Sequence, residues 1–195
     1  MSFETELKAH VQEDMVESVK AKLKQLPSCT VHGDISKFDV YWSDSEEGDP
    51  LFRTRKETCN GKTDVLFTAK PSKTKTKDGT EKNVEREFQA SGDQWDSILD
   101  FVRGVGCKVC RIKWKEGWHC TIEHNGFEIH AELLNVKYLN WFLEMEICTE
   151  TDADLDFVGA DKALREVLSY VGIDQSAVEP LGYNKMLRAI GHAKG

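Results

Sequence analysis

The chain has 195 residues, of which 39% are hydrophobic and 31% are charged, and its formal net charge is -8. This length suits one domain, so we expect a single domain over residues 1–195. So acidic a chain is not expected to bind nucleic acid or an anionic membrane surface, although a local basic site could still bind a small polyanion.

The sequence has no stretch near the roughly 20 apolar residues of a membrane-spanning helix. Its N-terminus also lacks the apolar region of a signal peptide. Its six cysteines are therefore expected to be reduced thiols. We expect a cytoplasmic protein with no membrane partner.

Hydrophobic periodicity predicts an alternating series of strands and helices. In chain order, the first half is expected to contain a strand at 3–10, a helix at 14–26, strands at 37–42, 51–57 and 64–70, a loop at 71–83, a strand at 84–89 and a helix at about 93–105. The segment 71–83 is assigned to a mobile loop because it has four lysines and no apolar residue.

The second half repeats this style. It is expected to contain a strand at 108–115, a hairpin around Asn125-Gly126, a strand at 141–148, and helices at about 159–171 and 180–190. Successive strands lie too close together in sequence for helical crossovers, so the sheet should be mostly antiparallel.

Nearly every predicted strand has one apolar face and one charged face. An open sheet could place its apolar face on helices and its charged face in water, and alternation alone favours this arrangement. A closed barrel with a polar lumen would also fit, with helices covering its apolar outer surface.

The charges, however, occur as like-charged neighbours on one strand face. The pairs are Glu4/Glu6, Arg53/Arg55, Glu85/Glu87, Arg111/Lys113 and Glu144/Glu146. Same-face neighbours are about 6.5–7 Å apart, so they repel unless a counterion lies between them. Paired carboxylates suit a divalent cation, and paired arginines suit phosphate oxygens. Together the pairs indicate a metal–polyphosphate site.

Glu4-Thr-Glu6-Leu-Lys8 matches the ExExK signature of the CYTH superfamily, the triphosphate tunnel metalloenzymes. Later segments resemble that family in the same order: FDVYW, LFRTRKE, LFTAKP, VEREF, VCRIKW and IHAELLNVKYLNWFLEMEI. The superfamily includes class IV adenylyl cyclases, thiamine triphosphatases and inorganic triphosphatases. The resemblance spans about residues 3–187 and implies an α+β fold, a closed antiparallel eight-stranded barrel with helices packed outside.

Three positions depart from the family pattern. Asn140 stands where a glycine is usual, and Glu132 replaces a usual aspartate. In LGYNKML, Tyr183 is kept but Lys185 occupies an acidic position. Glu85 and Arg86 are also permuted relative to the usual order, so the family role is carried over to Glu87.

The resemblance also implies roles for individual residues. One or two Mg²⁺ or Mn²⁺ ions would be bound by Glu4, Glu6, Glu132, Glu144 and Glu146. The triphosphate would be held by Lys8, Arg53, Arg55, Lys70, Glu87, Arg111 and Lys113, and more weakly by Lys185 from a helix that could cap the tunnel. Glu4, Glu6 and Lys8 are the expected catalytic residues.

The expected function is metal-dependent hydrolysis of a triphosphate: inorganic tripolyphosphate, thiamine triphosphate or a nucleoside triphosphate. One alternative is a class IV adenylyl cyclase that converts ATP to cyclic AMP and pyrophosphate. Another is a binding module for polyphosphate or nucleotide without catalysis. The expected partner is the small-molecule triphosphate, and a homodimer is an open alternative to a monomer.

Overall fold

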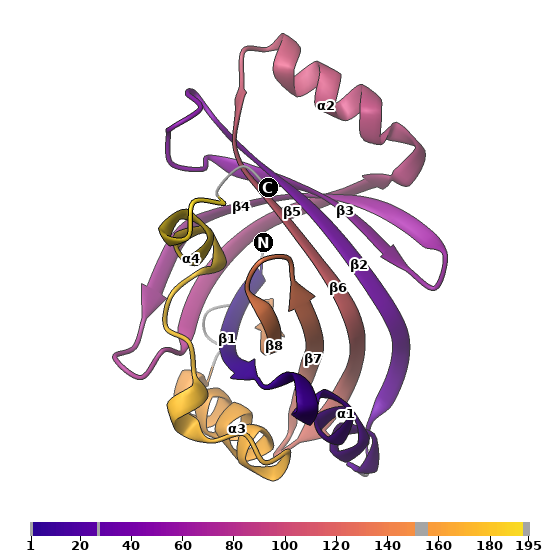
Figure 1. Ribbon diagram of the computed structural model, residues 1–195, viewed down its shortest axis with the longest axis vertical. Coiled ribbons are helices and arrows are strands. Elements are labelled where there is room, and N and C mark those ends of the chain that lie inside the picture. The colour runs from indigo at the N-terminus through magenta and orange to yellow at the C-terminus, as the bar shows by residue number, and fades with distance from the viewer. Residues whose placement is uncertain (1, 27, 151–155, 193–195) are drawn as a thin grey trace.

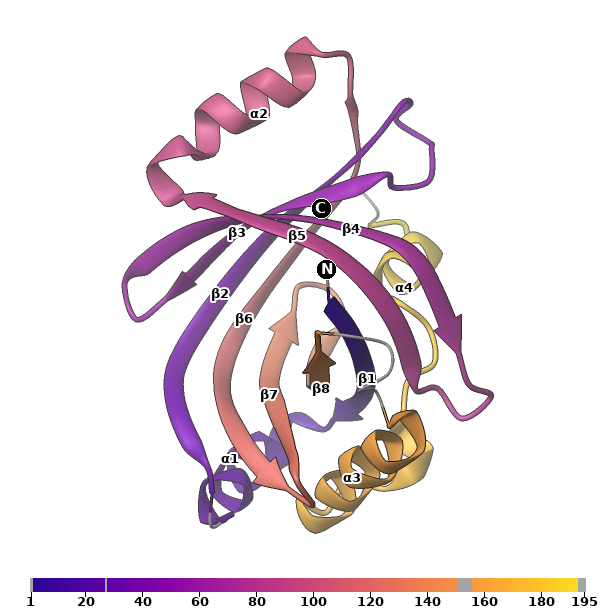
Figure 2. The ribbon, with the colours of Figure 1, turned by 180° about the vertical axis from the view of Figure 1, so that it is seen from behind.

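The computed structural model describes residues 2–26, 28–150 and 156–192. Across these residues, eight strands form a closed antiparallel barrel in the order β1-β5-β4-β3-β2-β6-β7-β8 (Figures 1 and 2). The strands are β1 (Ser2–Val11), β2 (Thr30–Ser43), β3 (Phe52–Cys59), β4 (Lys62–Lys75), β5 (Glu81–Ser91), β6 (Lys108–His124), β7 (Phe127–Val136) and β8 (Asn140–Thr149). The predicted barrel is therefore confirmed, and the open sheet is excluded.

Four α-helices in the described ranges lie outside the barrel: α1 (Val16–Gln25), α2 (Trp95–Gly104), α3 (Phe157–Tyr170) and α4 (Tyr183–Ala189). The largest apolar core lies between the outer barrel surface and α1 and α3, where Leu7, Leu133 and Met145 pack with Val19 and Leu164. Each such side chain contributes roughly 1.5–3 kcal/mol through its burial.

A second core lies under α2, which covers the opposite side of the barrel (Figure 2). Trp95, Leu99 and Val102 of this helix pack with residues of β2 and β4, including Trp42 and Val65. Strand alternation explains both cores, because apolar side chains that face outward leave the intervening polar side chains facing the lumen.

The C-terminal segment crosses one end of the barrel beside β1. The amide of Glu179 donates to the carbonyl of Lys8 at 2.8 Å, and Val178 forms a β-bridge with Ala9. Tyr183 of α4 then packs edge-on against Phe142, with ring centroids 5.0 Å apart. This end of the lumen is therefore lined by aromatic side chains.

Several predicted boundaries were wrong. The strand predicted at 37–42 begins at Thr30, as β2. The backbone at 71–75 continues β4 and pairs with β5, so the connection is only 76–80 instead of 71–83. This stretch lacks an apolar face, so alternation could not identify it as a strand. The strand predicted at 108–115 runs on to His124 as part of β6. No helix within the described ranges is long and apolar enough to cross a membrane.

Candidate functional site

Charged side chains line the barrel lumen, and the two signs are separated between walls. The neighbouring strands β3, β2 and β6 form a basic wall with Arg53, Arg55, Lys37, Arg111, Lys113 and Lys115. The neighbouring strands β7, β8, β1 and β5 form an acidic wall with Glu132, Glu144, Glu146, Glu4, Glu6 and Glu85. The lumen thus presents cations on one side and carboxylates on the other.

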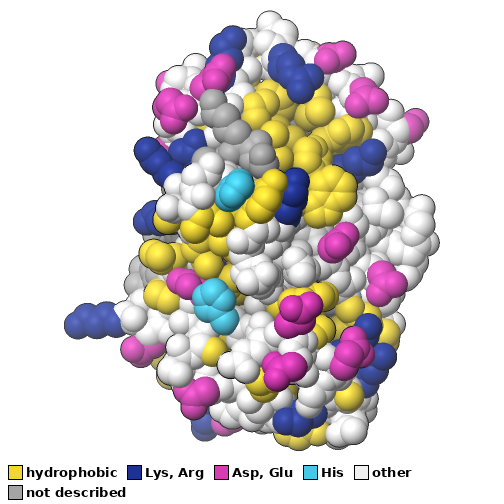
Figure 3. Space-filling view, viewed as in Figure 1, with side chains coloured by type: hydrophobic (Ala, Val, Ile, Leu, Met, Phe, Trp, Pro, Cys, Tyr) yellow, Lys and Arg dark blue, Asp and Glu magenta, His cyan; other side chains and the backbone are white. Residues whose placement is uncertain are grey.

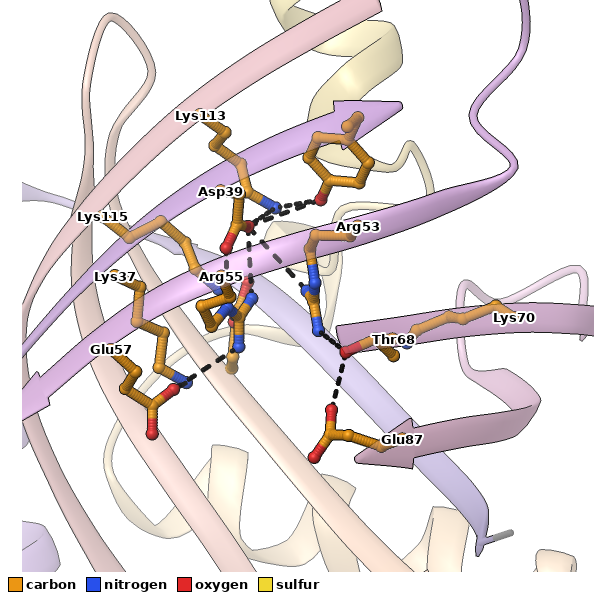
Figure 4. Close-up of polar contacts among 12 residues, drawn as sticks. Lys37, Asp39, Arg53, Arg55, Glu57, Thr68, Lys70, Glu87, Lys113 and Lys115 are labelled. Atoms are coloured by element: carbon orange, nitrogen blue, oxygen red, sulfur yellow. Dashed lines mark hydrogen bonds and ion pairs between the residues drawn. The ribbon is translucent and has the colours of Figure 1, made fainter. Parts of the chain in front are cut away.

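The centre of the basic wall is Asp39 of β2, which is 0% exposed. Arg55 contacts both of its carboxylate oxygens, at 2.6 and 3.2 Å, and the ammonium of Lys113 is 3.1 Å away. Arg53 lies 3.8 Å from the same carboxylate. Figure 4 shows these side chains converging from three strands.

The charges around Asp39 do not balance, because three cations contact this carboxylate and the other carboxylate beside them, Glu57, lies 3.7 Å from Arg55. Although burial alone would raise the pKa of Asp39, Arg55, Lys113 and Arg53 hold it well below its usual range. The phenol of Tyr41, at 2.9 Å, accepts the hydrogen bond of Lys113. The excess positive charge faces the lumen and suits a polyanion such as a phosphate chain.

Two further lysines of the basic wall reach carboxylates of the acidic wall. The ammonium of Lys115 is 2.7 Å from Glu144, and Lys37 forms an ion pair with Glu132. Burial would raise the pKa of Glu132, but Lys37 and Lys115 lower it below its ordinary value. Both carboxylates are therefore held in the charged form.

Lys70 of β4 is the cation closest to the start of β1. Its ammonium lies 2.8 Å from Glu4 and 2.5 Å from Glu85, but 4.0 Å from Glu6. Asn83 donates its amide N–H to Glu4 at 2.7 Å. Its buried amide oxygen has no hydrogen-bond donor among the described residues.

Glu6 and Glu146 are directly opposite each other in the pairing of β1 with β8. Burial, together with the charges of Glu4 and Glu132, raises the pKa of Glu146 to about 8. Burial also raises the pKa of Glu6, even though Lys70 acts against the shift. The one ion-pair contact of these two carboxylates with a described residue is thus the long one between Lys70 and Glu6.

The carboxylate set fits a hard divalent cation in its chemistry, since such ions prefer oxygen ligands. The strongest sign is that Glu6 lies opposite Glu146. Asn83 now turns its amide nitrogen toward Glu4 and Glu6, and its unpaired amide oxygen would reach them after rotation of the amide group. As they stand, no three His, Cys, Asp or Glu side chains in the described part of the chain are close enough to hold an ion. The ligands would have to draw together around it.

At the α4 end, Tyr183 reaches into the lumen instead of Lys185. Its ring lies 4.8, 5.0 and 5.5 Å from the ammonium groups of Lys8, Lys113 and Lys115. Burial and the nearby Glu144 carboxylate raise the pKa of Tyr183 well above its ordinary value. Lys185 points outward on α4 and is exposed.

The structure thus brings together most of the residues expected at the site, namely Glu4, Glu6, Lys8, Arg53, Arg55, Lys70, Arg111, Lys113, Glu132, Glu144 and Glu146. Glu87 is an exposed residue that accepts a hydrogen bond from Thr68 at 2.6 Å (Figure 4). Glu85, which the family order had set aside, makes the contact with Lys70. Lys185 does not join the group.

Sequence reasoning missed Lys37, Asp39, Asn83 and Lys115 as members of the site. Asp39 lies in the FDVYW motif, and Lys37 shares its strand face two residues earlier, so strand alternation could have indicated both. Lys115 likewise follows Arg111 and Lys113 at the same spacing. Asn83 was assigned to a loop and gave no such signal.

The outer surface differs from the lumen. On the face shown in Figure 3, acidic and basic side chains are interspersed with apolar ones, and neither charge dominates. On this face the charges are not separated as they are between the walls of the lumen, which is where a polyanion and a cation could be held together.

No protein-family model matches the sequence, and no curated protein matches it. Solved structures do match. A Pyrococcus horikoshii protein has a TM-score of 0.73 at 20% identity, with 96% of this chain and 99% of that chain covered. A candidate adenylate cyclase of Vibrio parahaemolyticus has a TM-score of 0.70 at 16% identity, covering 95% and 98%.

A third similar structure is a candidate adenylyl cyclase of Hippeastrum described as having a dominant triphosphatase activity. Its TM-score is 0.60 at 12% identity, with 98% of this chain and 96% of that chain covered. These likenesses are too distant in sequence to establish more than a shared architecture. The chain shares its closed eight-stranded barrel with these solved structures, and a barrel of this kind is the fold that its sequence motifs predict.

Proposed function

We propose that the protein is a metal-dependent triphosphatase that hydrolyses a small triphosphate in the barrel lumen. The substrate class covers inorganic tripolyphosphate, thiamine triphosphate and nucleoside triphosphates. The observation that carries the proposal is the charge arrangement. Three cations surround buried Asp39 on one wall, and on the other wall Glu6 and Glu146 lie opposite each other with Lys70, 4.0 Å from Glu6, as their one ion-pair partner among the described residues.

The basic wall would bind the phosphates. Arg53 and Arg55 offer planar guanidinium groups that can contact two oxygens each, and Lys113 adds a point charge. Asp39 fixes their positions before substrate arrives, because its contacts with Arg55 and Lys113 are 3.2 Å or shorter. Such preorganised charge is a large part of catalysis in phosphoryl transfer.

The acidic wall would hold Mg²⁺ or Mn²⁺ through Glu4, Glu6 and Glu146, with Asn83 beside them. A divalent cation bound there would neutralise phosphate charge and lower the pKa of a coordinated water. Lys8 and the Tyr183 ring line the α4 end, where they would help to exclude bulk water from the reacting phosphate.

A class IV adenylyl cyclase is the second candidate, since the same lumen could orient the α-phosphorus of ATP toward its own 3′-hydroxyl. The description of the Vibrio parahaemolyticus protein as a candidate adenylate cyclase favours this reading. The dominant triphosphatase activity ascribed to the Hippeastrum protein favours hydrolysis on the same fold. A binding module without catalysis is less favoured, since binding alone needs no acidic wall.

The test is to incubate the protein with Mg²⁺ or Mn²⁺ and, separately, tripolyphosphate, thiamine triphosphate and ATP, and then to resolve the products. We expect orthophosphate release. Glu4→Gln and Glu144→Gln should each lower the rate by about 100-fold or more while the circular dichroism spectrum is unchanged. Glu128→Gln, which removes an exposed carboxylate, should leave the rate unaltered.

Two outcomes would contradict the proposal. Cyclic AMP and pyrophosphate as the products of ATP would establish the cyclase. Tight binding of tripolyphosphate without turnover of any of the three compounds would establish the binding module.

A further inference from the structure

Two of the five carboxylates expected to bind metal already hold buried lysines. The Glu144 carboxylate lies 2.7 Å from Lys115, whose side chain is 4% exposed. Glu132 forms its ion pair with Lys37, whose side chain is 7% exposed. Each lysine is thus removed from water and directed at one carboxylate of the acidic wall.

The strand register makes these four residues one unit. Lys37 of β2 lies directly opposite Lys115 of β6, and Glu132 of β7 lies directly opposite Glu144 of β8. Like charges placed opposite each other on neighbouring strands repel. In this quartet each repelling pair is neutralised by the other, so Glu132 and Glu144 need no external counterion.

The two ammonium groups together carry the same charge as one divalent cation. A metal ion that bound Glu132 and Glu144 would have to displace both lysines, which would leave Lys115 buried without its ion-pair partner and Lys37 with Glu57, 3.4 Å away. Breaking a buried ion pair by removing one partner is strongly unfavourable. The quartet therefore opposes metal binding at these two carboxylates.

The other side of the acidic wall has one lysine, Lys70, which lies 2.8 Å from Glu4, but its side chain is 30% exposed and can move into water. Glu146 makes no ion pair with any described residue, and the closest cation to Glu6 is Lys70 at 4.0 Å. Lys70 is engaged more closely by Glu4 and Glu85. Beside Glu4 and Glu6, Asn83 is 0% exposed, and its amide nitrogen faces both carboxylates. Its amide oxygen has no hydrogen-bond donor in the described chain and would face them after rotation of the amide group.

We infer that the lumen binds one divalent cation, at Glu4, Glu6 and Glu146 with the amide oxygen of Asn83, and that Lys37 and Lys115 take the place of a second cation at Glu132 and Glu144. This inference rests on the proposed function and specifies its metal requirement. In this arrangement the two lysines supply fixed positive charge beside the phosphates, independent of the metal concentration.

The test counts bound Mn²⁺ by electron paramagnetic resonance during titration of the protein without phosphate, so it does not depend on turnover. The unmodified protein should bind one Mn²⁺. The double variant Lys37→Met/Lys115→Met frees Glu132 and Glu144 and should bind two. The matched control Lys62→Met/Lys137→Met removes two exposed lysines and should still bind one.

A second double variant, Lys37→Arg/Lys115→Arg, keeps both charges and should bind one Mn²⁺, which maintains the test if the methionine variant does not fold. Two ions bound to the unmodified protein, or to the arginine variant, would overturn the inference and leave the triphosphatase proposal standing. A folded methionine variant that binds only one ion would also overturn it. No Mn²⁺ bound to the unmodified protein would overturn both the inference and the proposed metal dependence.

Discussion

Asp39 is the residue on which the basic wall depends. Removing its charge with Asp39→Asn leaves Arg53, Arg55 and Lys113 close together without the carboxylate that all three contact, and Arg55 keeps only its longer contact with Glu57, at 3.7 Å. Loss of one partner from a buried ion pair costs about 3–5 kcal/mol, and we expect a loss of that order in the free energy of unfolding at pH 7. Urea denaturation followed by circular dichroism measures it.

The pH dependence of this variant has a definite sign. The pKa of Asp39 is lowered in the folded protein, mainly by Arg55 and Lys113 acting against the effect of burial. Its contribution to stability is therefore present above the unfolded pKa of about 3.9 and is lost as pH falls through the folded value. The difference between Asp39→Asn and the unmodified protein should shrink below about pH 4. The control is Asp64→Asn, which removes a partner of exposed Lys62 and should change the free energy of unfolding little at any pH. If the loss of stability in Asp39→Asn were the same at every pH, the ion pairs assigned to Asp39 would be contradicted.

For individual residues, the sequence was sufficient to locate the like-charged pairs that share one face of a strand. Arg53/Arg55 and Glu144/Glu146 are recognisable because strand alternation has a fixed period of two. The ion pairs between Lys115 and Glu144 and between Lys37 and Glu132 could not be foreseen. Each joins two strands that are separated by a third strand in the barrel, and the barrel order is not given by the sequence order. Lys185 was misplaced because the rotation of a seven-residue helix on the barrel end is not encoded in a motif.

Among the strands, β6 and β7 can approach each other closely because one residue of β6 is a glycine. A Cβ added to Gly117 would lie 2.0 Å from the carbonyl oxygen of Leu133 on β7. Gly117→Ala should therefore push β6 and β7 apart, at a cost of about 2 kcal/mol, and lower the melting temperature by about 4–8 °C. Differential scanning calorimetry measures the shift.

Gly104, the last residue of α2, is the matched control for that substitution. A Cβ there meets nothing within 4 Å, so Gly104→Ala should raise the stability slightly, by about 0.4–1 kcal/mol, by restricting the unfolded chain. A melting temperature for Gly117→Ala equal to or above that of the unmodified protein would show that the strands can separate without cost.

The β4–β5 hairpin shows where prediction of elements fails. The polar ends of its two strands have no apolar face that would identify them in the sequence, yet Lys75 pairs with Glu81 through the backbone. Its tip is held by Arg165 of α3, whose guanidinium donates to the Thr80 hydroxyl at 2.9 Å. Backbone pairing and a distant arginine maintain this hairpin, and neither can be read from local periodicity. The position of Asn140 was easier to interpret from the sequence. A glycine is usual there, and the φ of Asn140, 67°, lies in the left-handed region that glycine adopts readily.

For the molecule as a whole, alternation alone could not distinguish an open sheet from a closed barrel. What distinguished them was the kind of charge on the polar face, because paired like charges need counterions that water alone supplies poorly. Closure of β1 onto both β5 and β8 places these pairs around one lumen. The like-charged pairs that favour a closed barrel over an open sheet are thus the same pairs that suggest a metal–polyphosphate ligand.

A lumen built from repelling like-charged pairs should be more stable when ligands of opposite charge fill it. Saturating Mg²⁺ with tripolyphosphate, at about 100 times the dissociation constant, should stabilise the folded state by about 2.7 kcal/mol. For a chain of this size that corresponds to a rise of roughly 5–11 °C in melting temperature, measurable by differential scanning fluorimetry.

Mg²⁺ alone and sulfate at equal ionic strength should give much smaller shifts in melting temperature, since each leaves one wall of the lumen uncompensated. An Arg53→Met/Arg55→Met variant should lose most of the tripolyphosphate effect. If the unmodified protein shows no shift at saturation, its charged lumen is not a triphosphate site.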